Sequence, residues 1–342
     1  MDFPKRYHNI LQTICQLYLK KWLTKEIFVL FYNSYKAYLC QIYKFPIMYK
    51  KFFDVVKNFD FILVDNYGVV TFADGLNKEA VAVLQELRET GRKVVFLSNA
   101  TFTDPVERYA KKGLIKGVHF DEFVTSGQYA KEDIAKGTLP CGNKYCVFGT
   151  ANFKKPEKVP AIFNASPYDL VEKPEDADFI YCGIPQINGQ DRTTMDDFLP
   201  KLRRLAKIGL PMVVSNPDEI ASEDGRWVIR QGSIANAYRT LGGKVIMYGK
   251  PDPAIIDWVL PANFDWVSGD TPRSKVLMVG DTLGTDILGA NRAGIKSCLT
   301  ISGGVTEVRM LEQGIPVNEE GIYTFIEKQR SGIPDFIVDK IF

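Results

Sequence analysis

Residues 59–70 read FDFILVDNYGVV, a short apolar run that ends in an acid, a tyrosine and a glycine. A continuous apolar run of this length is typical of a strand buried on both faces of a parallel sheet. The same design of strand and then turn returns in KVVFLSNA (93–100) and EFVTSG (122–127), and later in KVLMVGDTLGTDI (275–287) and KSCLTISGG (296–304). These five stretches predict the parallel strands of one sheet.

Helical patterns separate these strands. Val81, Leu84 and Leu87 recur at helical spacing within 76–90, and 105–112 is a second candidate helix. Because strands alternate with helices, the sequence predicts an α/β fold with a doubly wound parallel sheet.

The middle of the chain carries a strand and helix pattern of its own. KYCVFG, DFIYCGI and PMVVSN read as strands, and helical patterns lie at about 194–208 and 232–241. We therefore expect an inserted α/β cap domain at 129–245 and a core built from 48–128 and 246–342.

The first 47 residues differ from the rest, since they are aromatic, rich in lysine and nearly free of acids. Three interpretations stay open for 1–47: a basic amphipathic helix on an acidic membrane surface, a helical appendage packed on the body, or an upstream stretch before a true start at Met48. The longest strongly apolar run, 27–32, is too short to span a bilayer, so we expect no integral membrane protein.

The charge and the cysteines narrow the function classes. The chain has a net charge of +2, but the part after residue 51 is acidic, which disfavours a nucleic-acid binder. The six cysteines are widely spread without a C-x-x-C pair, and only two histidines are present. Zinc binding is therefore disfavoured, and free thiols in the cytoplasm are expected.

Polar side chains stand at the ends of three predicted strands and in one further stretch. They are Asp65, Ser98, Asn99, Asp281 and Asp286, with Lys250 in YGKP (248–251). Each alone has an ordinary explanation, such as a helix cap, a turn or a solvated lysine. Sites in an open parallel sheet, however, form just beyond the carboxyl ends of the strands. Three carboxylates gathered there would repel unless a cation joined them, and oxygen ligands favour Mg²⁺.

Four ordered stretches resemble the four motifs of haloacid-dehalogenase (HAD) superfamily hydrolases, which have a Rossmann-type core. They are Asp65-x-x-Gly68-Val69, Leu97-Ser98-Asn99, Gly249-Lys250-Pro251 and Gly280-Asp281-x-x-x-Thr285-Asp286-Ile287. The last two forms, with an insertion before the lysine, are similar to the class IIA branch of p-nitrophenyl-phosphatases, pyridoxal phosphatases and phosphoglycolate phosphatases. Asn216-Pro217-Asp218 also resembles the C2-type cap of that branch. The resemblance covers about 58–310.

The resemblance implies a Mg²⁺-dependent hydrolase of a small phosphorylated molecule. Asp65 would be the nucleophile that becomes an aspartyl-phosphate. Ser98 would bind the phosphoryl oxygens with help from the N–H groups of a following helix start, and Lys250 would neutralise charge. The metal would be held by Asp65, the backbone carbonyl of Tyr67, Asp281 and Asp286.

The resemblance also implies where the substrate binds. Asn99 and Tyr67 would contact it at the core, and a cap loop around 219–222, with Glu219 first, would meet its far end. Caps of this branch often dimerise, so a homodimer stays open.

One position departs from the phosphatase pattern. Phosphatases of this superfamily carry a second Asp two residues after the nucleophile, as the acid and base of the reaction, and here that residue is Tyr67. A general acid or base contributes about 10²–10⁴-fold to a rate. Haloacid dehalogenases themselves have a similar Asp-x-Tyr-Gly opening and attack carbon without a metal, and a class IIA subgroup also has an aromatic residue here. The sequence therefore leaves three hypotheses: a phosphoryl hydrolase, a non-catalytic protein that binds a phosphorylated ligand, and a hydrolase acting at carbon.

Overall fold

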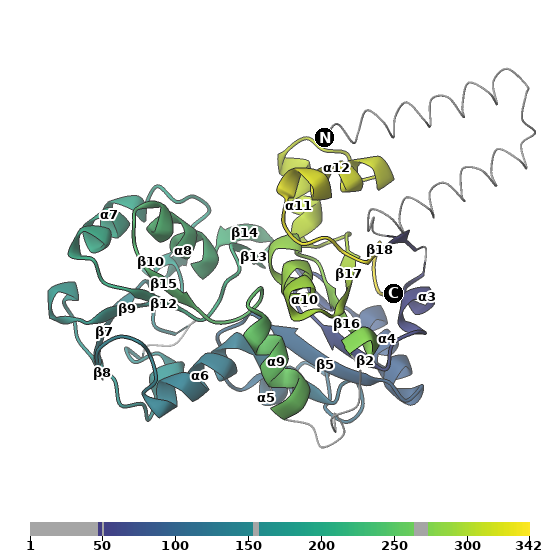
Figure 1. Cartoon of the computed structure of the whole chain (residues 1–342), viewed down its shortest axis with the longest axis horizontal. Coiled ribbons are helices and arrows are strands. Elements are labelled where there is room, and N and C mark those ends of the chain that lie inside the picture. Colours follow the sequence, from purple (N-terminus) through teal and green to yellow (C-terminus); the bar gives the residue numbers. More distant parts are fainter. Residues whose placement is uncertain (1–46, 50, 153–156, 263–272) are drawn as a thin grey trace, which may run out of the picture. The chain divides into compact units, whose positions relative to one another are not determined.

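The computed structural model describes residues 47–49, 51–152, 157–262 and 273–342 (Figure 1). Residues 48–342 form one compact unit. The interpretations of residues 1–46 lie outside the described residues. None of the described helices combines the length and the apolar character that a membrane span requires.

A seven-stranded sheet forms the centre of the compact unit. Its order is β1 (Ile47–Met48), β18 (Phe336–Val338), β17 (Lys296–Thr300), β16 (Val276–Gly280), β2 (Phe61–Val64), β5 (Lys93–Ser98) and β6 (Glu122–Thr125). The pairs from β18 to β6 are all parallel. All five stretches expected to form strands do so, and the predicted α/β fold with a doubly wound parallel sheet is confirmed.

Alternate residues of the central strands enter two separate cores. In β2, Ile62 and Val64 pack into one core, whereas Phe61 and Leu63 pack into the other. The first core lies against α3 (Phe52–Val56), α4 (Lys78–Glu89) and α5 (Pro105–Ala110), and the second against α9 (Pro253–Ala262) and α10 (Leu288–Ala293). Since apolar side chains are removed from water on both faces, an uninterrupted apolar run is what such a strand requires. Beyond β17, α11 (Val305–Glu312) and α12 (Glu319–Gln329) bury a smaller cluster.

The middle of the chain forms a second parallel sheet of five strands. Their order is β15 (Val245–Met247), β12 (Met212–Val214), β9 (Phe179–Cys182), β7 (Lys144–Phe148) and β8 (Asp169–Leu170). The apolar faces of α7 (Leu199–Ile208) and α8 (Gln231–Thr240) pack into one core beside it, and α6 (Ser126–Lys136) packs into another. The strands in KYCVFG, DFIYCGI and PMVVSN are confirmed as β7, β9 and β12. The boundaries of the cap domain at 129 and 245 stay a prediction.

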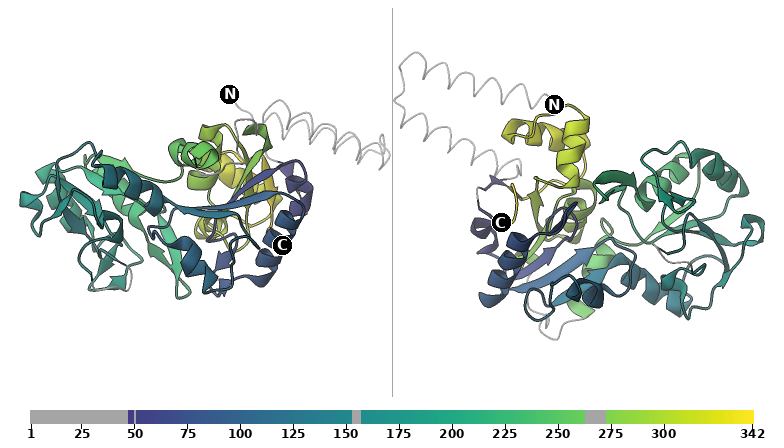
Figure 2. Two further views of the ribbon diagram at one scale, coloured as in Figure 1. Left: turned by 90° about the horizontal axis from the view of Figure 1, so that it is seen from below. Right: turned by 180° about the vertical axis from the view of Figure 1, so that it is seen from behind.

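The chain enters and leaves this middle stretch at neighbouring points. Ser126 donates a hydrogen bond from Oγ to the carbonyl of Ser215 at 2.7 Å. A Cβ added to Gly249 would lie only 2.8 Å from the Cβ of Ser126. Figure 2 shows the middle stretch, in teal and green, and the part with the seven-stranded sheet from two further directions.

Short elements account for the differences from the expected helix limits. The helix expected at 76–90 begins at Lys78, because Asn77 accepts a hydrogen bond from the Ala80 N–H and caps it. The preceding residues form a hairpin of β3 (Thr71–Phe72) and β4 (Gly75–Leu76). The helix expected from 194 begins at Leu199, after a turn in which the Phe198 N–H bonds to the Met195 carbonyl.

Two further hairpins and four single turns complete the described elements. The prediction of a loop at 219–222 is wrong in part. Ile220–Glu223 forms strand β13, which pairs antiparallel with β14 (Arg226–Ile229). The other elements are β10 (Gln186–Ile187), β11 (Gln190–Asp191), η1 (Ala161–Phe163), η2 (Pro174–Asp176), η3 (Arg273–Lys275) and η4 (Leu283–Ile287).

Candidate active site

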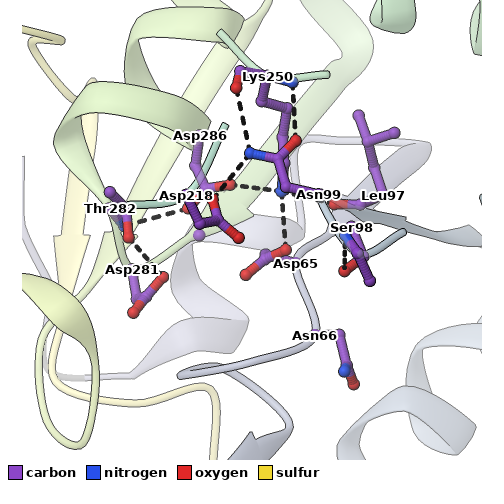
Figure 3. Close-up of polar contacts among 12 residues, drawn as sticks. Asp65, Asn66, Leu97, Ser98, Asn99, Asp218, Lys250, Asp281, Thr282 and Asp286 are labelled. Carbon is purple, nitrogen blue, oxygen red and sulfur yellow. Dashed lines mark hydrogen bonds and ion pairs between the residues drawn. The ribbon is translucent and has the colours of Figure 1, made fainter. Parts of the chain in front are cut away.

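The predicted site residues gather at the carboxyl ends of three adjacent strands, β16, β2 and β5. Asp65 directly follows β2, Ser98 ends β5, and Asp281 directly follows β16. The structure thus brings residues that are more than 200 positions apart in the chain to one edge of the sheet (Figure 3).

Lys250 is the centre of the charge network. Its Nζ donates to Asp65 Oδ1 at 2.7 Å, to Asp286 Oδ1 at 2.7 Å and to the Leu97 carbonyl at 2.6 Å (Figure 3). Only 1% of the lysine is exposed. Burial alone would lower the pKa of Lys250, but the carboxylates of Asp286 and Asp65 outweigh it and raise that pKa. The ammonium is therefore a permanent charge beneath the acids.

Three carboxylates surround this charge. Ligand oxygens of Asp65, Asp281 and Asp286 all lie within 4.8 Å of one another. Burial raises the pKa of Asp65 well above its usual range, although Lys250 opposes the shift. Burial and then Asp286 raise the pKa of Asp281 to about 7. One lysine cannot neutralise three acids, and a set of oxygen donors this close together fits a divalent cation.

Neighbouring groups orient two of these acids. Asp281 Oδ2 accepts from the Val305 N–H at 2.6 Å, and its Oδ1 accepts from the Thr282 hydroxyl at 3.0 Å. Asp286 Oδ2 accepts from the Thr282 N–H at 3.1 Å. Sequence reasoning missed Val305 and Thr282, because a backbone N–H carries no sequence signal and a threonine after a strand is a common turn residue.

Gly68 is in close contact with one carboxylate of the acid cluster. Gly68 has φ +81°, and a Cβ there would lie 2.2 Å from Asp281 Oδ2. The glycine of the first motif is therefore needed both for the left-handed backbone and for the close approach of this carboxylate.

Ser98 and Asn99 differ in their placement. Ser98 lines the cleft at the site, and its Oγ accepts from the Ala100 N–H at 3.3 Å. The segment from Asn99 to Asp104 is irregular and α5 begins only at Pro105, so no helix starts directly after Ser98, contrary to expectation. Asn99 Oδ1 accepts from the Lys250 N–H at 2.8 Å, and its Nδ2 donates to the Lys250 carbonyl at 3.1 Å. Asn99 thus holds the backbone of the lysine, and its contact with substrate stays a prediction.

Asp218 is a further acid that the candidate set had left out. Its Oδ1 accepts from Asn99 Nδ2 at 2.8 Å, and its charge contributes to the raised pKa of Asp65 (Figure 3). Burial raises the pKa of Asp218 itself to about 6, against the opposing charge of Lys250. The sequence feature that could have identified Asp218 is the Asn-Pro-Asp motif, but such a motif is also typical of an ordinary turn.

Tyr67 and Glu219 both line the cleft but lie in different surroundings. Tyr67 is 41% exposed and interacts with the buried Tyr109. Burial, and then Tyr67, raise the pKa of Tyr109. Glu219 already pairs with Arg309 at 3.3 Å and accepts from Asn236 Nδ2 at 2.8 Å. Metal binding by the Tyr67 carbonyl and substrate binding by Glu219 stay predictions.

The cleft above the acids is large, with a volume of about 1840 Å³. It is lined from the core by Asp65, Ser98 and Asp281 and from the middle stretch by residues such as Asp218 and Trp227. This space exceeds the roughly 300–1,000 Å³ of an ordinary small-molecule pocket. The cleft has room for a substrate much larger than phosphate.

Comparison with protein-family models gives two matches. Residues 62–158 match a model described as haloacid dehalogenase-like hydrolase, and residues 247–322 match a HAD-hydrolase-like model. Together they span just over half of the chain and include Asp65, Ser98, Lys250, Asp281 and Asp286.

Similar proteins include phosphatases. The chain is 25% identical over 285 residues to the sugar-phosphatase AraL of Bacillus subtilis, covering 82% of this chain and 90% of that protein. A haloacid dehalogenase-like hydrolase from Brucella suis has a similar structure, with a TM-score of 0.69 and 26% identity over 86% of this chain and all of the other. A glycerol phosphate phosphatase from Mycobacterium tuberculosis in complex with magnesium has a TM-score of 0.52 and 25% identity, over 73% of this chain and 70% of the other.

Proposed function

Because this chain is a phosphatase-like hydrolase of the haloacid-dehalogenase superfamily, we propose that it hydrolyses a small phosphorylated molecule through a phosphoryl group carried on Asp65. The observation that carries the proposal is the position of Lys250. Its ammonium bonds to Asp65 and Asp286 at 2.7 Å, directly below the cleft. A carboxylate held in this way is oriented before the substrate arrives.

The residues of the site would divide the work of phosphoryl transfer. One oxygen of Asp65 accepts from Lys250, which leaves the other oxygen to attack phosphorus. The hydroxyl of Ser98 would donate to a phosphoryl oxygen, since it lines the cleft at the end of the adjacent strand. Asn99 would act mainly by fixing the backbone of Lys250, as its two hydrogen bonds to that backbone indicate.

We propose Mg²⁺ as the cation of the acid cluster, held by Asp65, the Tyr67 carbonyl, Asp281 and Asp286. When bound, the ion would supply Lewis-acid charge to the phosphoryl oxygens. The all-oxygen donor set supports Mg²⁺ over zinc, which prefers nitrogen and sulfur ligands.

Three broader proposals accompany this one. Residues 129–245 would act as a cap that selects the substrate, and Glu219 would meet the far end of that substrate. The four cysteines described are free thiols, which is consistent with a reducing compartment such as the cytoplasm. A homodimer formed through the caps stays a prediction that the mass in solution would test.

A second candidate function is a non-catalytic protein that binds a phosphorylated ligand. The observation that favours it is Tyr67, because the tyrosine replaces the acid that protonates a leaving group and activates water. Hydrolysis at carbon comes third, because the Asp65, Asp281 and Asp286 cluster fits a cation that this chemistry does not need.

Hydrolysis of p-nitrophenyl phosphate with and without Mg²⁺ tests the proposal. Turnover should require Mg²⁺ and be lost in Asp65→Asn, while acid-quenched wild-type protein should gain the mass of one phosphoryl group. Asp60→Asn is the matched control, since this exposed acid directly precedes the first residue of β2, at the end of the strand opposite Asp65. Thermal stabilisation by phosphate without any turnover would instead favour the binding protein, and metal-independent chloride release from a haloacid would favour chemistry at carbon.

A further inference from the structure

Tyr67 belongs to a group of side chains on one side of the cleft. Its partner Tyr109 is fully buried, and the Tyr109 hydroxyl also accepts a hydrogen bond from Asn66 Nδ2 at 2.5 Å. These contacts hold the Tyr67 hydroxyl against that of Tyr109, and Tyr67 lines the same cleft as Asp65, two residues before it in the chain. The position two residues after the proposed nucleophile therefore carries a phenol in place of a carboxyl group.

Two cationic side chains stand beside this pair. Lys112 Nζ lies 4.8 Å from the ring centroid of Tyr109, and Arg108 Cζ lies 4.5 Å from that of Phe102. The rings of Phe102 and Tyr109 are themselves 6.2 Å apart. Tyr67, Phe102, Arg108 and Lys112 all line the same cleft. Aromatic rings thus hold two positive charges next to the hydroxyl pair.

Within the described ranges of the chain, Lys112 has no ion pair and Arg108 has a weak one. Arg108 pairs with Asp104 at 3.6 Å, and both side chains are substantially exposed, so this pair contributes little. The Nε of Arg108 is buried without a hydrogen-bond partner in the part of the chain that the structure describes. This buried donor faces no acceptor among the described residues, whereas the exposed part of the Arg108 side chain and Lys112 both line the cleft. These exposed cationic groups are suited to an anionic group delivered by a ligand.

We infer that the leaving group of the substrate departs as an anion, so that the substrate is an acyl phosphate or a phosphoanhydride, and that Arg108 and Lys112 bind this anion. The inference rests on the proposed function. A carboxylate, whose acid has a pKa of about 4, leaves without a proton. An alkoxide, with a basicity near that of hydroxide, needs a proton donor, and a tyrosine hydroxyl is a much weaker acid than the carboxylic acid that it replaces. Positive charge then takes the place of a proton donor.

The reaction balances without an added acid. An Asp65 oxygen forms a bond to phosphorus while the bond from phosphorus to the leaving oxygen breaks, and the electron pair stays on that oxygen as carboxylate or phosphate. Water then forms a bond to phosphorus, and the bond to Asp65 breaks. For an acyl phosphate, the products are carboxylate, inorganic phosphate and one proton released to solvent.

The test compares four substrates at saturating Mg²⁺: acetyl phosphate, inorganic pyrophosphate, glycerol phosphate and p-nitrophenyl phosphate. At least one of the first two should exceed glycerol phosphate by about 100-fold or more in kcat/KM, the lower end of what an acid contributes. Which of the two is preferred distinguishes an acyl phosphate from an anhydride. Comparable rates on acetyl phosphate, pyrophosphate and glycerol phosphate would overturn the inference and leave the proposed function standing. No turnover of any substrate would overturn both.

Single variants distinguish the effect of losing a positive charge from the effect of a disturbed fold. Arg108→Gln and Lys112→Gln should each lower kcat/KM on the preferred substrate about tenfold and leave that on glycerol phosphate within about twofold, as expected for one partly screened charge. Lys111→Gln is the control, since Lys111 is exposed and pairs with Glu107 at 3.0 Å. Equal losses on all substrates would indicate a structural role and refute the leaving-group assignment. Tyr67→Asp should raise glycerol phosphate hydrolysis and reduce the preference.

Discussion

Replacement of Lys250 by methionine should destabilise the protein much more at high pH than at low pH. The ammonium now donates to two buried carboxylates and one carbonyl. Removing one partner of a buried ion pair costs about 3–5 kcal/mol, because a charge is left without compensation. Methionine keeps most of the length of the lysine stem, so the loss of packing should be small.

The pH dependence follows from the acids that remain. Burial already raises the pKa of Asp65, and loss of Lys250 removes the charge that opposes this shift. A carboxyl whose folded pKa lies above its unfolded value stabilises the fold below the unfolded pKa, and that contribution is lost as the pH rises through the folded pKa. The free energy of unfolding of the variant should therefore fall by about 3–5 kcal/mol relative to wild type at pH 8. The fall should be clearly smaller at pH 5, because protonation of the carboxyl on acidification removes the uncompensated charge.

Urea unfolding followed by circular dichroism, with a chelator present, measures the free energy of unfolding at pH 8 and at pH 5. Lys296→Met is the matched control, because Lys296 pairs with Asp335 at 2.6 Å but is half exposed. Its loss should be under about 1 kcal/mol at either pH. An equal loss for Lys250→Met at both pH values, or one no larger than the control, would refute the role of the ammonium as compensating charge.

Three further predictions concern the metal and the intermediate. Mg²⁺ affinity should fall as the pH drops below about 7, by up to about tenfold per pH unit. The reason is that the pKa of Asp281 is raised to about 7 and only the ionised carboxyl binds metal. Calorimetric titrations that give the same affinity from pH 8 to pH 5.5 would contradict this. Gly68→Ala should abolish Mg²⁺ binding, since its Cβ would lie 2.2 Å from Asp281 Oδ2, whereas Gly113→Ala, which has φ +93° and open space, should cost about 1 kcal/mol and leave Mg²⁺ binding intact. With an activated substrate, rapid quenching should trap a phosphoryl group on Asp65, because Tyr67 is a poor base for water. Tyr67→Asp should shorten the lifetime of this phosphoryl-enzyme about 100-fold or more. An unchanged lifetime would count against Tyr67 as the cause of slow hydrolysis.

The parallel strands could be predicted because each is buried on both faces and therefore reads as an unbroken apolar run. The hairpins β3–β4 and β13–β14 could not, since strands of two to four residues, most of them partly exposed, carry neither an apolar run nor a clear alternation. Their pairing depends on the turn and on neighbours distant in the sequence.

The site was predictable in its membership more than in its contacts. Asp65, Asp281 and Asp286 follow strands that a parallel sheet must bring to one edge. The placement of Asp218 against Asn99, 119 positions away, depends on how the middle stretch returns to the main sheet. Nor does sequence spacing reveal that Asn99 holds the Lys250 backbone.

The contact between Ser126 and Gly249 has a consequence for how such proteins diversify. Since the Cβ of Ser126 lies close to Gly249, we expect that the segment between them can be exchanged, or shortened to a few linker residues, without altering the pairing of β16, β2 and β5. Only tethers such as the one from Asp218 to Asn99 would need to be rebuilt. We expect ligand preference to be transplantable between relatives while the machinery at the strand ends stays unchanged.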